Sequence, residues 1–205
     1  MQAPALSGDL LDLGCGIKPY ESLFTVNKYI GVEYYGEGET YDKQYADFFY
    51  DGKTLPFGDN SFDSVFCSEV FEHVFNLDEI LTELHRVMKS KGKMLITCPF
   101  VFPEHEVPND FARYTVFALK DMLEQKGFTV TRIIKSGSFA EVAAQLRILN
   151  YEYNIHKYVK KIPVVRSVLK YMVYGINNGW AATVGSLFKS RNQIYLSNIV
   201  LAEKK

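Results

Sequence analysis

The sequence predicts an α/β protein in which helices cover both faces of a mostly parallel sheet. Short apolar runs alternate along the chain with stretches whose apolar residues recur at the helical period, a pattern typical of strands joined by helical crossovers. With 205 residues, of which 47% are hydrophobic, the chain is long enough for one such domain with a full core. We therefore expect a single domain over residues 1–205.

Seven apolar runs predict the strands of the sheet. They are residues 9–14, 28–34, 45–49, 62–68, 92–99, 128–135 and 194–202. Helical patterns occur at residues 18–25, 76–89 and 115–126 and at several places between 138 and 188. Thr115 is a suitable N-cap, and Gly127 ends the helix that Thr115 would begin. Because nearly 60 residues separate the last two strands, we expect residues 138–192 to form a helical insertion.

The first predicted strand ends in a turn suited to holding a ligand. Gly14 and Gly16 stand there, and a residue without Cβ takes unusual φ values and lets a ligand lie against the backbone. A dinucleotide fingerprint would need a third glycine where this chain has Pro19, which disfavours a nucleotide-dependent oxidoreductase. Asp12 is a poor neighbour for a phosphate and a good one for a cation. The turn therefore suggests S-adenosylmethionine, which carries a sulfonium and an ammonium but no phosphate.

Further motifs follow this turn in order. They are Gly31-Val32-Glu33, Asp51-Gly52, Leu55-Pro56-Phe57, Asn60-Ser61-Phe62-Asp63, Ser68-Glu69-Val70-Phe71-Glu72-His73-Val74 and Arg86-Val87-Met88-Lys89. The series resembles the class I S-adenosylmethionine-dependent methyltransferases, with a type-11-like methyltransferase domain. The resemblance covers residues 5–135 and the last dozen. It implies a Rossmann-like, seven-stranded sheet with an antiparallel last strand, and the helical insertion precedes that strand.

The resemblance also implies which residues hold the cofactor. Glu33 ends the second strand, 17 residues after Gly16, where one carboxylate can accept from both ribose hydroxyls. Asp51 resembles the family's adenine site, at which a carboxylate accepts from the exocyclic amine. Asp47 competes for that role, and the spacing from the Leu-Pro-Phe motif favours Asp51. The complete set of expected cofactor-binding residues is Asp12, Gly14, Cys15, Gly16, Glu33, Tyr34, Asp51, Gly52, Ser68 and Glu69.

The segment from Pro99 to Thr115 reads as a long loop at the ligand edge of the sheet. Three prolines, one histidine, three acids and several aromatics fit neither a helix nor a strand, and long loops on a rigid sheet often carry function. His-Glu-x-Pro followed by Asp-Phe and Arg-Tyr-Thr resembles a subset of these methyltransferases. His105 is the expected general base, with Glu104 or Glu106 able to orient it.

A second histidine and several loop residues complete the expected acceptor site. His73 follows the fourth strand and is either a second catalytic residue or a histidine that caps or packs at a helix start. The expected substrate-binding residues are Glu104, Asp110, Arg113 and Tyr114. Alternatively, Arg113 and Asp110 form an ion pair that pins the loop.

The spacing of the cysteines and the start of the chain lead to predictions about bound metal and about the cellular compartment. Cys15, Cys67 and Cys98 lie far apart and match no metal-ligand spacing, so we expect reduced thiols and no bound metal. The N-terminus lacks the pattern of a signal peptide, and the first strand begins so early that the chain is either a natural short form or truncated. We expect a cytoplasmic protein, and no nucleic-acid partner because no reader motif is visible.

Charge is distributed unevenly along the chain. Residues 1–152 hold 14 basic and 23 acidic side chains, whereas residues 153–205 hold 9 basic and 1 acidic, which implies a partner or surface of opposite sign. Basic and apolar residues alternate over 157–174, as in a helix that contacts the inner face of a membrane peripherally. A lid with solvated lysines is the alternative. The uncharged stretch 171–188 approaches a membrane span in length, but Asn177-Asn178-Gly179 interrupts it.

These features predict a methyltransferase that acts on a small molecule. Methyl transfer from a sulfonium needs the acceptor, the carbon and the sulfur held in line, and a closed, dry site helps because charge is lost as the bond forms. The basic insertion favours an anionic or membrane-linked acceptor, such as a sugar or lipid intermediate of envelope polysaccharide synthesis. The alternative is a non-catalytic, methyltransferase-like binding or scaffold module that retains the cofactor site.

Overall fold

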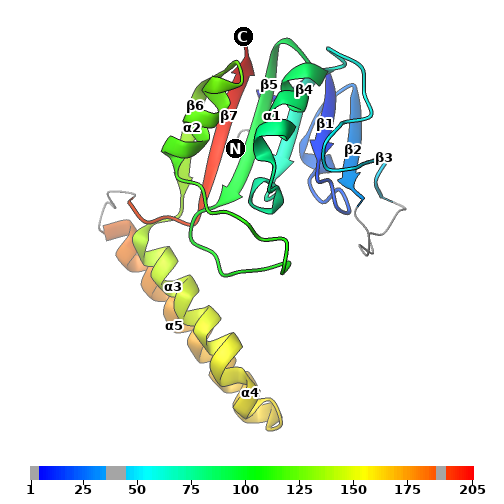
Figure 1. Cartoon of the computed structure of the whole chain (residues 1–205). Coiled ribbons are helices and arrows are strands. Elements are labelled where there is room, and N and C mark those ends of the chain that lie inside the picture. Colours follow the sequence, from blue (N-terminus) through cyan, green and yellow to red (C-terminus); the bar gives the residue numbers. More distant parts are fainter. Residues whose placement is uncertain (1–4, 36–44, 188–192) are drawn as a thin grey trace. The chain divides into compact units, whose positions relative to one another are not determined.

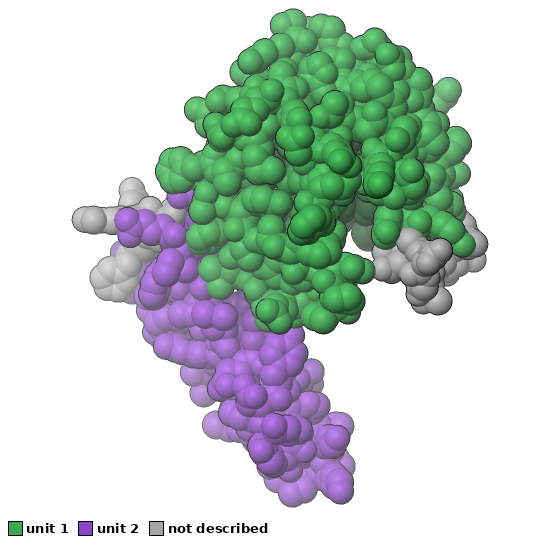
Figure 2. Space-filling model, in the orientation of Figure 1, with its two compact units in different colours: residues 1–134, 198–205 green, residues 135–197 purple. Residues whose placement is uncertain are grey.

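The structure, a computed structural model, describes residues 5–35, 45–187 and 193–205. The chain divides into two compact units (Figure 2). Unit 1 consists of residues 1–134 and 198–205, and unit 2 consists of residues 135–197. Residues 188–192, the end of the insertion that the sequence predicts, lie outside the described residues.

One sheet of seven strands has the order β3-β2-β1-β4-β5-β7-β6 (Figure 1). The strands are β1 (Asp9–Leu13), β2 (Lys28–Tyr34), β3 (Phe48–Tyr50), β4 (Phe62–Ser68), β5 (Met88–Pro99), β6 (Phe128–Ser136) and β7 (Ser197–Lys204). β1 pairs in parallel with β2 and β4, and parallel pairing continues to β3 on one side and β5 on the other. β7 is antiparallel. The predicted fold class is confirmed, and the strand order reverses between β1 and β4.

The central strands are apolar because both of their faces are covered. On one face, Leu11 and Val65 are fully buried in the main core with residues of α1 (Leu77–Val87) and α2 (Val116–Gln125). On the other face, Leu10 and Phe66 pack in a smaller cluster that includes Phe24. Successive side chains of a strand point to opposite faces, so neighbours in β1 enter different clusters.

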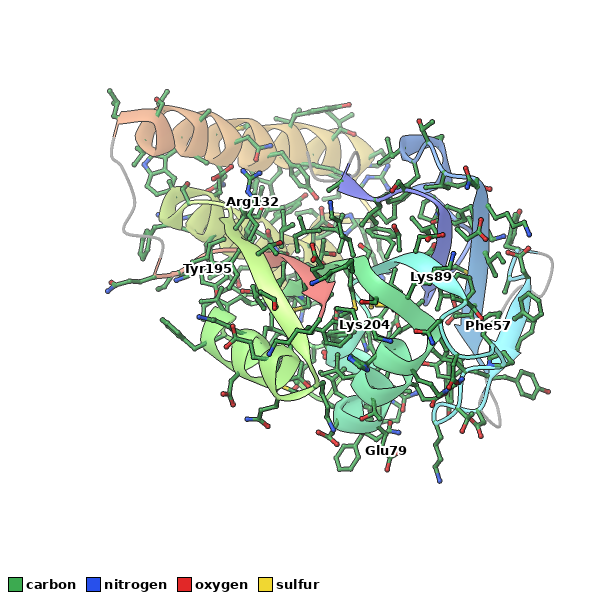
Figure 3. All side chains as sticks on the ribbon, turned by 90° about the horizontal axis from the view of Figure 1, so that it is seen from above. Phe57, Glu79, Lys89, Arg132, Tyr195 and Lys204 are labelled. Carbon is green, nitrogen blue, oxygen red and sulfur yellow. The ribbon has the colours of Figure 1, made fainter. Side chains whose placement is uncertain are left out.

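The helices of unit 1 follow from their apolar spacing and caps. α1 buries five residues at helical spacing, Leu77, Ile80, Leu81, Leu84 and Val87. Thr115 accepts a hydrogen bond from the amide of Ala118 at 3.2 Å and so caps α2 as predicted. Lys204, labelled in Figure 3, is the last residue of β7. Its ammonium donates to the carbonyl of Met88, the first residue of β5, at 2.7 Å.

The helix predicted at residues 18–25 is wrong. Only a short 3₁₀ turn forms, η2 (Glu21–Leu23). Lys18 has a φ of 53°, which is incompatible with the right-handed helix, and it precedes Pro19, which disfavours the helical conformation at the residue before it. A second 3₁₀ turn, η3 (Phe71–His73), follows β4.

Unit 2 contains a helical hairpin. Its first arm is α3 (Phe139–Asn150), the π-helical segment η4 (Tyr151–Ile155) and α4 (His156–Val159), and its second arm is α5 (Pro163–Leu187). Ser138 begins α3 with a capping box, and α5 begins at a proline, which suits the first turn of a helix. The arms contact each other along their length: Arg147 lies over the ring of Trp180, 4.6 Å from its centroid. None of the helices in the described ranges is both long enough and apolar enough to cross a bilayer.

Candidate functional site

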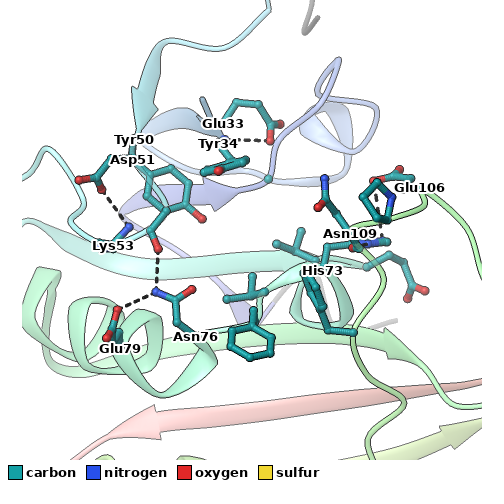
Figure 4. A pocket seen from close by; sticks show the side chains of 18 of the residues that line it. Glu33, Tyr34, Tyr50, Asp51, Lys53, His73, Asn76, Glu79, Glu106 and Asn109 are labelled. Atoms are coloured by element: carbon teal, nitrogen blue, oxygen red, sulfur yellow. Dashed lines mark hydrogen bonds and ion pairs between the residues drawn. The ribbon is translucent and has the colours of Figure 1, made fainter. Parts of the chain in front are cut away.

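A cleft of about 920 Å³ lies where β1, β2, β3 and β4 end (Figure 4). This is the carboxyl edge of the sheet at the reversal of strand order, the place where open α/β sheets bind ligands. The lining comes from the turn after β1, the ends of β2 and β3, the segment after β4 and the loop after β5. The cleft therefore collects most of the motifs that the sequence singles out.

The turn after β1 requires its two glycines for different reasons. Gly14 has a φ of 68°, and a Cβ there would collide with a methyl group of Val70. Gly16 has a φ of 49°, and a Cβ there would meet nothing within 4 Å. Both backbone conformations are unfavourable for residues with side chains. Gly14 thus lets the turn pack against the segment after β4, and Gly16 leaves open backbone at the cleft.

Glu33 at the end of β2 is held by the turn. One carboxylate oxygen accepts from the amide of Gly16 at 2.8 Å, and the other accepts from the amide of Tyr34 at 3.0 Å. The residue is only 9% exposed, yet it lines the cleft. A carboxylate oriented in this way suits recognition of neighbouring hydroxyl groups.

Of the two acids proposed for the adenine site, only Asp51 lines the cleft. Its carboxylate accepts from the amides of Lys53 and Thr54 at 2.9 and 2.8 Å, and these bonds hold its pKa below the usual value. Asp47 instead accepts from the amide of Gly31 at 2.7 Å and pairs with a lysine, away from the cleft lining. Asp51 is therefore the acid of this pair that is placed to contact a ligand in the cleft, and its role at an adenine site stays a prediction.

The wall beside Asp51 is made by an aromatic ring and an amide. Gly52 has a φ of 80°, and a Cβ there would lie 2.8 Å from the ring of Tyr34. The side chain of Asn76 donates to the carbonyl of Gly52 at 3.0 Å. Tyr34 and Gly52 were expected at the cofactor site, whereas Asn76 was not. It follows the Glu-His motif by three residues and carries no signal of its own.

Glu69 and Ser68 differ in their positions. Glu69 lines the cleft with a φ of 54°, and its amide donates to the carbonyl of Thr97 at 2.9 Å. Burial raises the pKa of its carboxyl. Ser68 does not line the cleft, and its hydroxyl bonds to that of Thr97 at 2.9 Å. Glu69 is therefore the member of this pair that lines the cleft.

Asp12 and Cys15 are expected cofactor residues that lie outside the cleft lining. Asp12 is buried, accepts from the hydroxyl of Tyr29 at 2.5 Å, and has its pKa raised to about 7 by burial. Its side chain points to the same face of the sheet as Leu10, because the two are separated by two positions in β1. Cys15 is a buried free thiol, as are Cys67 and Cys98. Asp12 thus bonds to β2 and does not line the cleft.

The loop after β5 folds back onto η3. The amides of Phe111 and Ala112 donate to the carbonyl of Glu72 at 2.8 and 3.3 Å. This return brings His105 to His73, with 3.1 Å between their Nε2 atoms. His73 lines the cleft, and His105 contacts it from outside that lining. The two predicted catalytic histidines therefore lie together, although 32 residues separate them.

Arg113 and Asp110 form the ion pair that the sequence left as an alternative. Two guanidinium nitrogens donate to the two carboxylate oxygens at 2.6 and 2.7 Å. The same carboxylate accepts from the amide of His105 at 2.9 Å, and the guanidinium holds the pKa of Asp110 well below its usual range. The pair pins the loop. Tyr114 packs partly buried against the main core, and neither Tyr114 nor Glu104 lines the cleft.

Sequence reasoning assigned no role to Glu72. Its side chain is completely buried, and neither carboxylate oxygen has a hydrogen-bond partner within the part of the chain that the structure describes. Burial raises its pKa to about 8. The one signal in the sequence for Glu72 was its position directly before His73, and that position is also typical of an ordinary helix start.

Comparisons with known proteins agree with this arrangement. Residues 11–96 match a family model described as a methyltransferase domain. An uncharacterised protein of Methanocaldococcus jannaschii is 38% identical over 79 residues, which are 37% of this chain and about a third (34%) of that relative.

Solved structures extend the likeness over nearly the whole chain. Phosphoethanolamine N-methyltransferase 2 of Haemonchus contortus, in complex with S-adenosyl-L-methionine, matches with a TM-score of 0.56 and 18% identity, covering 98% of this chain and 50% of that one. The [4+2]-cyclase SpnF matches with a TM-score of 0.59 and 19% identity, covering 99% of this chain and 78% of that one. Residues 11–96 thus resemble a methyltransferase domain, and the sheet that contains them has the Rossmann-like fold of these solved structures.

Proposed function

We propose that this protein is an S-adenosylmethionine-dependent methyltransferase with a small-molecule acceptor. The observation that carries the proposal is that Glu33 and Asp51, from adjacent strand ends, face one cleft beside the open backbone of Gly16. Two carboxylates and a glycine turn suit a cationic ligand with a ribose and an adenine. The same set would repel a pyrophosphate.

Each cofactor residue has a separate task in this proposal. Glu33 accepts from the ribose hydroxyls, Asp51 accepts from the exocyclic amine of adenine, and the Gly14 to Gly16 turn receives the methionine end. S-adenosylmethionine supplies an activated methyl group on a sulfonium. The residues of the chain fit it, because a Cβ at Gly16 would stand in otherwise open space.

The acceptor belongs at the end of the cleft that His73, Glu106 and Asn109 line. The protein must hold the reacting atoms in line at about 3 to 3.5 Å. A hydroxyl or ammonium acceptor must also lose a proton, and His73 with His105 are the residues proposed to assist that loss. Asp110 and Arg113 fix His105 by fixing the loop.

We expect the acceptor to be anionic or membrane-linked, such as a sugar or lipid intermediate of envelope polysaccharide synthesis. The support is the excess of basic residues in 153–205 and the exposed apolar surface of unit 2. In α5, Val164, Val168 and Tyr171 recur at helical spacing and are 74%, 54% and 78% exposed. Such a stripe beside lysines is typical of helices that bind anionic lipid surfaces.

Vesicle flotation tests the membrane contact. The full chain should float with vesicles rich in anionic lipid at low salt and be released at high salt. The double substitution Arg166→Ala with Lys170→Ala should weaken this, whereas Lys91→Ala with Lys93→Ala, two exposed lysines of unit 1, should not. Absence of flotation at low salt would remove the membrane contact and leave the lid as the role of unit 2.

Isothermal titration with S-adenosylhomocysteine tests the function at its first step. The intact chain should bind in the low-micromolar range, about −8 kcal/mol. Glu33→Ala should abolish binding, and Glu124→Ala, a similar change on the exposed side of α2, should preserve it. No binding by the intact chain would overturn the proposal. Binding without methyl transfer to any acceptor in a screen of anionic sugars and lipids would favour the scaffold alternative.

A further inference from the structure

Three side chains with metal-ligating atoms converge at the acceptor end of the cleft. They are Glu72, His73 and His105, and their ligand atoms all lie within 4.8 Å of one another. The two Nε2 atoms are 3.1 Å apart, and the Glu72 oxygen Oε1 lies 3.8 Å from that of His73 and 4.0 Å from that of His105. Ligand bonds of about 2.0 to 2.1 Å would place such atoms about 2.9 to 3.4 Å apart. From 3.8 and 4.0 Å, the oxygen would have to approach the two nitrogens by about 0.4 to 1.1 Å.

The hydrogen bonds of the two imidazoles determine which nitrogens face inward with lone pairs. His73 Nδ1 lies 2.6 Å from the carbonyl of Asn109, a contact that requires Nδ1 to carry the proton. His105 Nδ1 lies 3.3 Å from both a carboxylate oxygen of Asp110 and the carbonyl of Pro103, and 3.5 Å from a guanidinium nitrogen of Arg113, which can only donate. In the tautomer in which His105 Nδ1 donates to one of the two oxygens, both Nε2 lone pairs point at each other, and a cation between them would satisfy both.

Glu72 supplies the third lone-pair donor. Its side chain is completely buried, its carboxylate has no hydrogen-bond partner among the described residues, and its oxygen Oε1 lies 3.8 and 4.0 Å from the same two Nε2 atoms. A buried carboxylate without a donor is costly, and a bound cation would satisfy it. Glu106 lies 3.8 Å from His73 Nε2 on the exposed side and adds negative charge there.

We propose that Glu72, His73 and His105 bind one divalent transition-metal ion. Two imidazoles and one carboxylate suit first-row ions such as Mn²⁺, Fe²⁺, Co²⁺ or Zn²⁺. Three protein ligands leave coordination positions open, and those positions face the cleft because His73 lines it. The carbonyl of Asn109 and the carboxylate of Asp110 act as outer partners that orient the two rings. The expectation of no metal rested on cysteine spacing alone and did not consider side chains that the fold brings together.

This site defines the acceptor more closely, on the condition that the proposed methyltransferase function holds. A ligand hydroxyl bound at an open position loses its proton to solvent, because the ion stabilises the oxyanion. The oxyanion then forms the O–CH₃ bond as the S–CH₃ bond breaks, and S-adenosylhomocysteine leaves as a neutral thioether. The acceptor is therefore a hydroxyl compound, and His73 and His105 assist the loss of its proton by holding the ion.

Cobalt binding to untagged, chelator-treated protein tests the site without reference to activity. Titration with Co²⁺ should produce visible absorption bands that saturate at one ion per chain. His105→Ala and Glu72→Gln should each weaken Co²⁺ affinity at least tenfold. The matched control is His156→Ala, which removes a histidine 3.6 Å from Glu152 that belongs to no such triplet, and it should bind Co²⁺ like the intact chain.

Two measurements keep this result interpretable. Binding of S-adenosylhomocysteine by each variant shows that the fold and cofactor site persist, and it separates failure of the metal site from failure of the proposed function. If Glu72→Gln does not fold, His105→Ala decides, because that side chain lies partly exposed in a loop. Absence of Co²⁺ binding by a chain that binds S-adenosylhomocysteine, or unchanged affinity in His105→Ala, would overturn the metal site in favour of a proton shared by the two imidazoles.

Discussion

Replacing Gly14 by alanine tests whether the turn after β1 is built as described. The substitution adds a single methyl group at a φ of 68°, in a place where that group collides with Val70. Gly16→Ala is the natural comparison. It adds the same group at a φ of 49°, but with no atom of the chain within 4 Å.

The two substitutions share one cost and differ in a second. A left-handed conformation costs a residue with a side chain about 1 to 2 kcal/mol, so Gly16→Ala should lower the free energy of unfolding by about that amount. Gly14→Ala adds overpacking against Val70, which costs about 1 to 3 kcal/mol. Its total should therefore be about 2 to 5 kcal/mol.

Urea denaturation of the two variants and of the double variant Gly14→Ala with Val70→Ala provides the measurement. Because Val70→Ala removes the colliding methyl group, the double variant should recover about 1 to 2 kcal/mol relative to the sum of the single effects. Equal losses for Gly14→Ala and Gly16→Ala, or strict additivity in the double variant, would refute the close contact between the turn and Val70.

Two further predictions concern charges. Burial raises the pKa of Asp12 from 3.8 to about 7, so the folded state binds its proton more tightly than the unfolded state. The contribution of this proton binding to the free energy of unfolding is complete below about pH 4 and is lost as the pH rises through 7. Because asparagine does not titrate, Asp12→Asn should lose up to about 4 kcal/mol less free energy of unfolding over this pH range than the intact protein. Parallel pH profiles of the free energy of unfolding for the two proteins would contradict this prediction. Arg113→Lys should lower the free energy of unfolding by about 1 to 3 kcal/mol, because a lysine cannot replace the two hydrogen bonds that the guanidinium donates to the carboxylate of Asp110. Lys120→Ala, which breaks a surface pair, should change thermal stability little, and equal effects of the two would argue against a pinned loop.

Local signals in the sequence determined the architecture. The apolar runs marked six of the seven strands to within a few residues of their observed limits, and the fifth begins at Met88 instead of residue 92. Thr115 marked the start of α2. Such features depend on neighbours along the chain, through side-chain alternation, helical period and capping, so they can be read without the fold. The same holds for the Gly-x-Gly turn and for Glu33 at a strand end.

The tertiary structure decided the features that depend on the direction of a side chain and on contacts between residues that are distant in the sequence. The sequence placed Asp12 at the ligand turn, but the pleat of β1 directs it to Tyr29, outside the cleft lining. Only the fold shows that Asp51 lines the cleft and Asp47 does not. The cluster of Glu72, His73 and His105 exists because the loop after β5 returns to η3 through backbone hydrogen bonds. No spacing encodes that return, since its geometry depends on contacts that form only when the whole sheet edge is assembled.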